Sequence, residues 1–121
     1  MATISPVQTR VSNDNDEEGW ESKWGPMGTG DTALTTDLIG FADRSVQVEG
    51  TFGAGGALAV EGSNDRVNFH VLRDPLGVAL SFTSADLRAI MEASVVVRPR
   101  VTGGDGTTAL TVCLLHRRTK T

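Results

Sequence analysis

Residues 45–61, SVQVEGTFGAGGALAVE, contain two alternating segments separated by a glycine-rich turn. Polar residues flank Val46 and Val48, and this period of two is typical of a strand with one buried face and one solvated face. The GAGG tetrapeptide ends the first segment, after which Leu58 and Val60 resume the alternation. The stretch therefore predicts two neighbouring β-strands.

The next segment, GSNDRVN at 62–68, indicates a tight polar turn. Asn64 and Asp65 tolerate the left-handed backbone that such turns demand, which predicts a β-hairpin. We expect Phe69 and Val71 to point inward from the strand that follows. The hairpin then serves as framework.

The segment TSADLRAIMEA at 83–93 has the apolar spacing of a helix. Leu87, Ile90 and Met91 fall on one face of about two helical turns, and Thr83 is a candidate N-cap. Because two turns are too short to be stable in isolation, we expect a short helix that lies against a sheet.

Alternation returns at 94–101 and at 110–114, on either side of the glycine-rich segment TGGDGTT. Pro99 has no amide hydrogen to give to a ladder, so its strand is predicted at a sheet edge. Five or six short strands with tight turns and one helix predict a mainly all-β fold, an antiparallel β-sandwich, over residues 32–121.

Residues 1–31 differ from the rest in composition, because they are rich in turn-forming and charged residues and show no sustained periodicity. They predict an extended, acidic N-terminal arm. Six of the 15 acidic residues and two of the 11 basic residues lie there, so the arm carries the whole net charge of −4. An acidic arm is repelled by phosphate backbones, and nucleic acid is not an expected partner.

Two pairs of residues are candidates for contacts with other molecules. Trp20 and Trp24 stand four apart in the polar arm, where they either cover the arm's own domain or meet a partner's surface. Arg98 and Arg100 fall on the solvated face of the predicted edge strand. They either block pairing at that edge or contribute to a subunit interface.

The sequence contains no motif for catalysis, metal binding or cofactor binding. Cys113 and His116 stand three apart in a predicted strand and point to opposite faces, which is poor geometry for zinc. There is no G-x-S-x-G elbow, and the glycine runs lie between strands instead of before a helix with a phosphate-binding lysine. No enzyme activity, cofactor or metal is expected.

Two further features bear on where the chain works. A single cysteine forms no intrachain disulfide, which fits synthesis in a cytoplasm. No apolar run approaches the length of about 18 residues that a spanning helix needs, so no membrane partner is expected.

The stretch from about residue 45 to residue 118 resembles small structural proteins of tailed bacteriophages. In that group a GSNDG.NW hairpin leads to L.D..G..L.FT and then to VRP.V.GGDGTT.LTV.LL.R. This chain carries GSNDRVNF, LRDPLGVALSFT and VRPRVTGGDGTTALTVCLLHR at the corresponding places. It departs at Arg66, where the group favours glycine, and at His70, where an aromatic residue is commoner.

The most similar members of this group are capsid decoration, or cement, proteins of short-tailed phages. The resemblance implies a jelly-roll-like β-sandwich on the outer surface of the virion capsid, present as a homodimer or homotrimer that reinforces joints between subunits of the major capsid protein. In that setting Trp20 and Trp24 are candidates for capsid contact, and Arg98 and Arg100 for the subunit interface.

The alternative is a carbohydrate- or receptor-binding β-sandwich of a phage tail appendage. Such sites usually present several exposed aromatic side chains on the sandwich. This chain has no tyrosine, and both of its tryptophans lie in the predicted arm.

Overall fold

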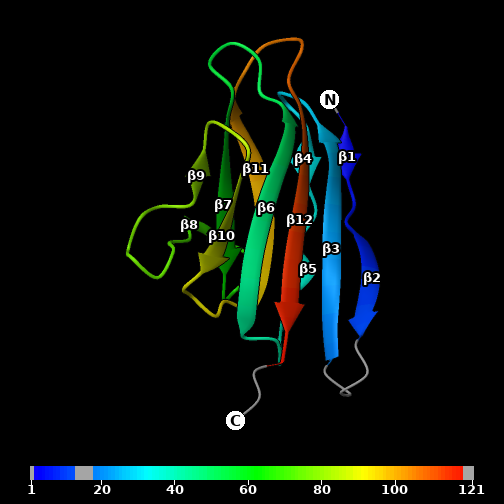
Figure 1. Ribbon diagram of the computed structural model, residues 1–121, viewed down its shortest axis with the longest axis vertical. Coiled ribbons are helices and arrows are strands. Elements are labelled where there is room, and N and C mark those ends of the chain that lie inside the picture. The colour runs from blue at the N-terminus through cyan, green and yellow to red at the C-terminus, as the bar shows by residue number, and fades with distance from the viewer. Residues whose placement is uncertain (1, 13–17, 119–121) are drawn as a thin grey trace.

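The computed structural model describes residues 2–12 and 18–118, which fold into two packed five-stranded sheets and one small two-stranded sheet (Figure 1). The first sheet has the order β10 (Asp86–Ile90), β6 (Asp43–Thr51), β12 (Ala109–Arg117), β3 (Glu18–Met27) and β2 (Val7–Ser12). All four ladders in it are antiparallel.

The second sheet has the order β5 (Thr36–Asp37), β11 (Val96–Gly103), β7 (Ala57–Ser63) and β8 (His70–Val71), and β9 (Ser81–Phe82) also pairs with β7. Outside these two sheets, β1 (Thr3–Ile4) pairs in parallel with β4 (Thr32–Ala33). The all-β class and its antiparallel sheets are therefore confirmed. No helix occurs in the described ranges, and so none there is long and apolar enough to cross a membrane.

The core lies between the two main sheets and is built from the alternating residues of their strands. Val46 and Val48 of β6 and Leu58 and Val60 of β7 are all buried in it, as the alternation predicts. The strand after the 62–68 turn is different, because Val71 is exposed there. The expectation that Val71 points inward is wrong.

The predicted extended arm over residues 1–31 is wrong for 7–12, which form β2 of the first sheet, and for 18–27. Residues 18–27 form β3, which lies inside the first sheet between β12 and β2. Trp24 is only 1% exposed and belongs to the core, and its indole nitrogen donates to the carbonyl of Leu34 at 2.8 Å. Ser22, two residues before Trp24, is buried and bonds to His116, so a polar residue occupies an inward position of the strand. The alternation of apolar and polar residues is therefore hidden in the sequence.

The predicted helix within 83–93 is also wrong. Asp86–Ile90 forms β10, which pairs with Arg44–Val48 of β6 and so gives its backbone partners that a short isolated helix would lack. Leu87 and Met91 are exposed and only Ile90 is buried. Pairing with an open strand edge outweighs a weak helical spacing here.

Pro99 does not mark a true edge strand, because β11 has β5 on one side and β7 on the other. The ladder with β5 ends at Val97, however, and Pro99 follows where only β7 pairs with the strand. The missing amide hydrogen therefore coincides with the end of one ladder.

We predict that Gly25→Ala destabilises the fold by about 1–3 kcal/mol. The register between β3 and β12 shifts at this point, and Gly25 has a φ of 132°. A Cβ atom there would lie 2.8 Å from the carbonyl oxygen of Leu110. Urea unfolding measures the loss. Gly106→Ala is the control, because open space surrounds that position, and equal effects for the two variants would contradict the prediction.

Candidate functional site

Two clusters of polar side chains stand out in this sandwich, and each includes residues that the sequence analysis singled out. The first, here called the ion cluster, consists of Glu61, Arg98, Arg100 and Phe69. The second, here called the histidine cluster, consists of Gln8, Ser22, Thr36, Arg44 and His116.

The ion cluster lies on the outer face of the second sheet. Glu61 on β7 stands opposite Arg98 on β11, and its buried carboxylate is shared by two guanidinium groups. Its Oε1 is 3.3 Å from Nε of Arg98, and its Oε2 is 3.4 Å from Nε of Arg100. The Phe69 ring covers Arg98, with 3.7 Å between the guanidinium carbon and the ring centroid. One carboxylate against two cations leaves a local excess of positive charge.

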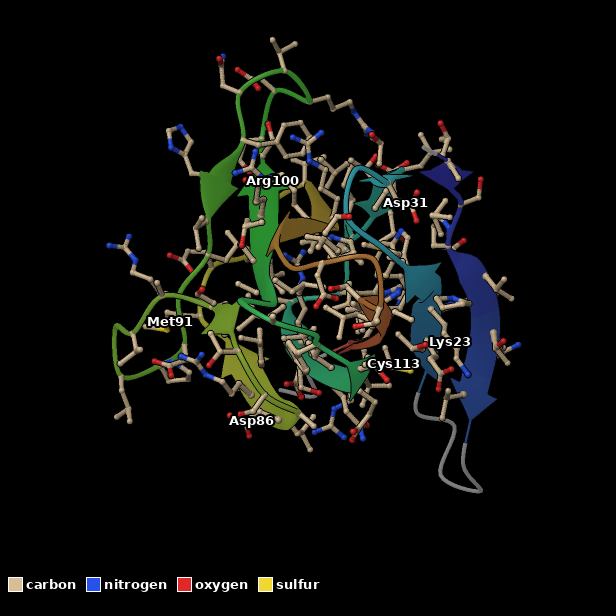
Figure 2. The ribbon with its side chains drawn as sticks, turned by 90° about the horizontal axis from the view of Figure 1, so that it is seen from above. Lys23, Asp31, Asp86, Met91, Arg100 and Cys113 are labelled. Atoms are coloured by element: carbon tan, nitrogen blue, oxygen red, sulfur yellow. The ribbon has the colours of Figure 1, made fainter. Side chains whose placement is uncertain are left out.

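Arg98 and Arg100 also border a hollow of about 350 Å³ whose opposite wall is Gly30–Ala33. Asp31 is in that wall, but its carboxylate accepts hydrogen bonds from the amides of Gly28 and Ala2 at 2.8 and 2.9 Å. These bonds, with that from Gly28 the larger cause, lower the pKa of Asp31. Figure 2 shows Arg100 and Asp31 at this side of the molecule, away from Cys113 on the first sheet.

The histidine cluster connects the two sheets near one end of the core. His116 on β12 is 2% exposed, and its Nε2 lies 2.9 Å from the Ser22 hydroxyl on β3. Ser22 lies 3.1 Å from the Thr36 hydroxyl on β5 of the second sheet. Gln8 on β2 donates to Thr36 as well. A chain of hydroxyl and amide groups therefore crosses from the first sheet to the second.

His116 is held in its neutral form. Burial and, to a smaller extent, the nearby positive charge of Arg44 lower the pKa of His116 to about 4. Its Nδ1 has no hydrogen-bond partner within the part of the chain that the structure describes. Phe41 packs edge-on against the ring, with centroids 5.5 Å apart.

Ser22 and His116 have the spacing of a nucleophile and its base, but their surroundings are those of a core. The Ser22 hydroxyl is completely buried, so no substrate carbonyl reaches it in this conformation. No described carboxylate bonds to Nδ1 to orient the ring. The hydrogen bond between Ser22 and His116 connects β3 to β12 inside the core, which is a structural role.

Arg44 has a buried guanidinium group. Within the described residues, this group donates hydrogen bonds only to main-chain carbonyl groups. Its Nε, Nη2 and Nη1 reach the carbonyl oxygens of Phe41, Leu38 and Glu92 at 2.7, 3.1 and 3.4 Å. Burial lowers the pKa of Arg44. The side chain thus fastens the loop after β5 and the loop after β10 to the first sheet.

The structure places the other predicted residues as follows. Trp24 is in the core, so the expectation that it contacts a capsid is wrong. Trp20 is half-buried and lies opposite His116, and its contact with a capsid stays a prediction. Cys113 and His116 point to opposite faces of β12, as predicted. Burial raises the pKa of the Cys113 thiol. An interface role for Arg98 and Arg100 also stays a prediction, because the contacts seen are within the chain.

Sequence reasoning missed Glu61 as a shared counter-ion and missed Ser22 and Thr36 altogether. A signal for the histidine cluster was present, since His116 continues the buried series Leu110, Val112 and Leu114. A polar residue at an inward position predicts a buried hydrogen-bond partner. Nothing in the local sequence indicates which partner it has.

No protein-family model, curated protein or solved structure matches the chain. Over residues 2–12 and 18–118, no group of three or more histidine, cysteine, aspartate or glutamate side chains is arranged to hold a metal ion. The geometry itself therefore has to carry any proposal about function.

We predict that the fold loses about 2 kcal/mol of stability between pH 7.5 and pH 5 through His116. The unfolded histidine takes up a proton near its ordinary pKa of 6.5, whereas the folded one does so only near 4. The unfolded state therefore binds more protons in this window, and stability falls as the pH falls. Urea unfolding at both pH values measures the difference.

His116→Gln should abolish most of this pH dependence, because the amide does not titrate. His70→Gln is the matched control, since His70 is exposed and lies outside the histidine cluster, so this variant should keep the loss of stability assigned to His116. An unchanged loss of stability in His116→Gln would contradict the assignment.

We predict that Arg98→Met destabilises the fold by about 1–3 kcal/mol and Arg100→Met by less than about 1 kcal/mol. The Arg98 side chain is 30% exposed and stacks on Phe69, whereas that of Arg100 is 60% exposed. Arg117→Met is the control, because Arg117 pairs with Asp43 at the surface. Equal values from urea unfolding for all three variants would contradict this ranking.

Proposed function

We propose that this chain is a virion structural protein that binds the outer surface of a phage capsid and cements neighbouring major capsid subunits, as a homodimer or homotrimer. The resemblance of residues 45–118 to phage decoration proteins supports this proposal. We include in this proposal that the two sheets form a jelly-roll-like sandwich, as the resemblance implies. The observation that carries the proposal is a set of exposed apolar side chains at one edge of the first sheet, on a backbone that ion pairs and hydrogen bonds hold in place.

This set, here called the β10 flank, runs along β10 and the neighbouring turn at 74–78. It consists of the exposed side chains of Leu76, Val78, Leu87 and Met91. The two segments adjoin, because Arg88 of β10 pairs with Asp74 and the amide of Met91 bonds to Arg73. Exposed apolar side chains on adjoining segments are typical of surfaces that bind another protein. Figure 2 shows Met91 at the margin of the molecule, on the side opposite Lys23.

The backbone beneath the β10 flank is held by ion pairs and hydrogen bonds. Arg88 of β10 reaches Asp74 at 2.7 Å, and this contact is the largest cause of the lowered pKa of Asp74. The amide of Met91 donates to the carbonyl of Arg73 at 2.8 Å, and Arg73 also pairs with Glu92. The apolar side chains are therefore presented in a fixed arrangement, which reduces the entropy lost on binding.

A cement protein needs only modest contacts of this kind. On a symmetric shell the same contact is repeated many times, and a subunit that touches two capsid proteins binds each at a high effective concentration. In this proposal the β10 flank replaces Trp24 as the contact with the major capsid protein, while half-buried Trp20 stays available only at its exposed edge.

We predict that the chain co-sediments with expanded, undecorated shells of its phage and saturates at a copy number commensurate with the major capsid protein. Leu76→Ser combined with Leu87→Ser should weaken binding by about tenfold or more, because two anchors of about 1 kcal/mol each are lost. Val67→Ser is the control, since Val67 is exposed on a different loop.

Two results would count against this proposal. Full binding by the double variant would remove the β10 flank from the contact. A folded wild-type chain that does not bind shells but does bind immobilised glycans would favour the carbohydrate- or receptor-binding alternative.

A further inference from the structure

The strand β2 forms an open edge of the first sheet. It pairs with β3 through Val7↔Lys23 to Ser12↔Glu18, and no described strand lies on its other side. Figure 1 shows β2 at the outer margin of the sheet, and Figure 2 shows the same edge from above with no ribbon beyond it. Its outward main-chain groups are thus free to pair with another strand.

The other edges are shorter or contain a proline. On the opposite side of the first sheet, β10 has five residues, and the segment 73–78 bonds to the amide of Met91 and to the side chain of Arg88. The second sheet ends in β5 and β8, which have two residues each, and the side of β11 beyond Val97 that β5 leaves unpaired contains Pro99. Among the described residues, β2 with its six residues is the longest strand that stands at the end of a sheet.

Of the features that usually block an edge, β2 has only one charged residue, Arg10. Its sequence, VQTRVS, holds no proline, lysine or acidic residue. Val7 is 67% exposed and Val11 is 44% exposed, and both lie on the outer face of the sheet with Thr9 between them. An exposed edge that alternates apolar and hydroxyl side chains favours pairing.

The strand is complementary to a second copy of itself. In an antiparallel pair centred on Thr9, Val7 stands opposite the partner's Val11, and Gln8 stands opposite the partner's Arg10. The only charged residue of the strand therefore faces an amide, and no like charges meet. We propose that two copies of this chain associate through β2, so that their first sheets join into one ten-stranded sheet.

This inference rests on the self-association in the proposed function but not on shell binding. An edge of six residues buries far less than a standard interface, so the dimer should dissociate at concentrations on the order of micromolar. Pairing in solution without shell binding would overturn the proposed function and leave this inference in place. Shell binding by a strict monomer would overturn this inference, together with the oligomeric state in the proposed function, and leave shell binding in place.

The experiment is sedimentation equilibrium of the full chain over a concentration series, on the wild type and on two charge variants. Val7→Lys with Val11→Lys places like charges opposite one another in the dimer and should weaken association at least tenfold. Val7→Glu with Val11→Lys places opposite charges there and should keep association close to that of the wild type. Leu87→Lys, on the far edge of the same sheet face, should have no effect.

A second measurement tests the register directly. Thr9→Cys should give a covalent dimer under mild oxidation, because Thr9 meets its own copy at the centre of the pair. Glu21→Cys, one strand further in on β3, should not. A wild type that stays monomeric at millimolar concentration, or equal association by both charge variants, would overturn the proposal, as would a failure of Thr9→Cys to cross-link faster than Glu21→Cys.

Discussion

The pairing of β12 with both β6 and β3 is the constraint on which this structure depends. β12 is the last strand, yet it lies at the centre of the first sheet and connects the N-terminal strands to the rest. Its register with β6 runs without a break from Ala109↔Thr51 to Arg117↔Asp43. A slip of one residue would turn its buried leucines and valine to solvent and would expel His116 from the core. The burial of this face therefore specifies one register for the central strand of the sheet.

This register also determines the electrostatics of the interior. Trp20, His116 and Arg44 stand in one row across β3, β12 and β6, on the face that meets the second sheet. Burial and, to a smaller extent, the positive charge of Arg44 lower the pKa of His116, so the imidazole in this row stays neutral. A polar row in a core this small contributes less to stability than apolar packing would, but it specifies which strands meet.

Much of the fold was predictable from residues whose local pattern agrees with their tertiary surroundings. The alternation around Val46 and Leu58 indicates β6 and β7 directly, because each strand buries one face. β10 was not predictable in this way, since its spacing favours a helix and only the open edge of β6 makes it a strand. β3 was missed because Ser22 stands where an apolar residue was expected, and its partners come from β5 and β12. The ion cluster likewise depends on the pairing of β7 with β11, which no single stretch reveals.

The order of strands in the first sheet separates its two exposed surfaces. β10 and β2 lie at opposite edges, with β6, β12 and β3 between them. If two copies join through β2, their β10 flanks come to lie at the two ends of a ten-stranded sheet. With neighbouring strands about 4.8 Å apart, the flanks are separated by about 40 Å. A body with two apolar ends at a fixed spacing binds two neighbouring sites at once, and the second contact is then intramolecular. The two proposed contacts, self-pairing and shell binding, use opposite edges of the sheet and therefore do not compete.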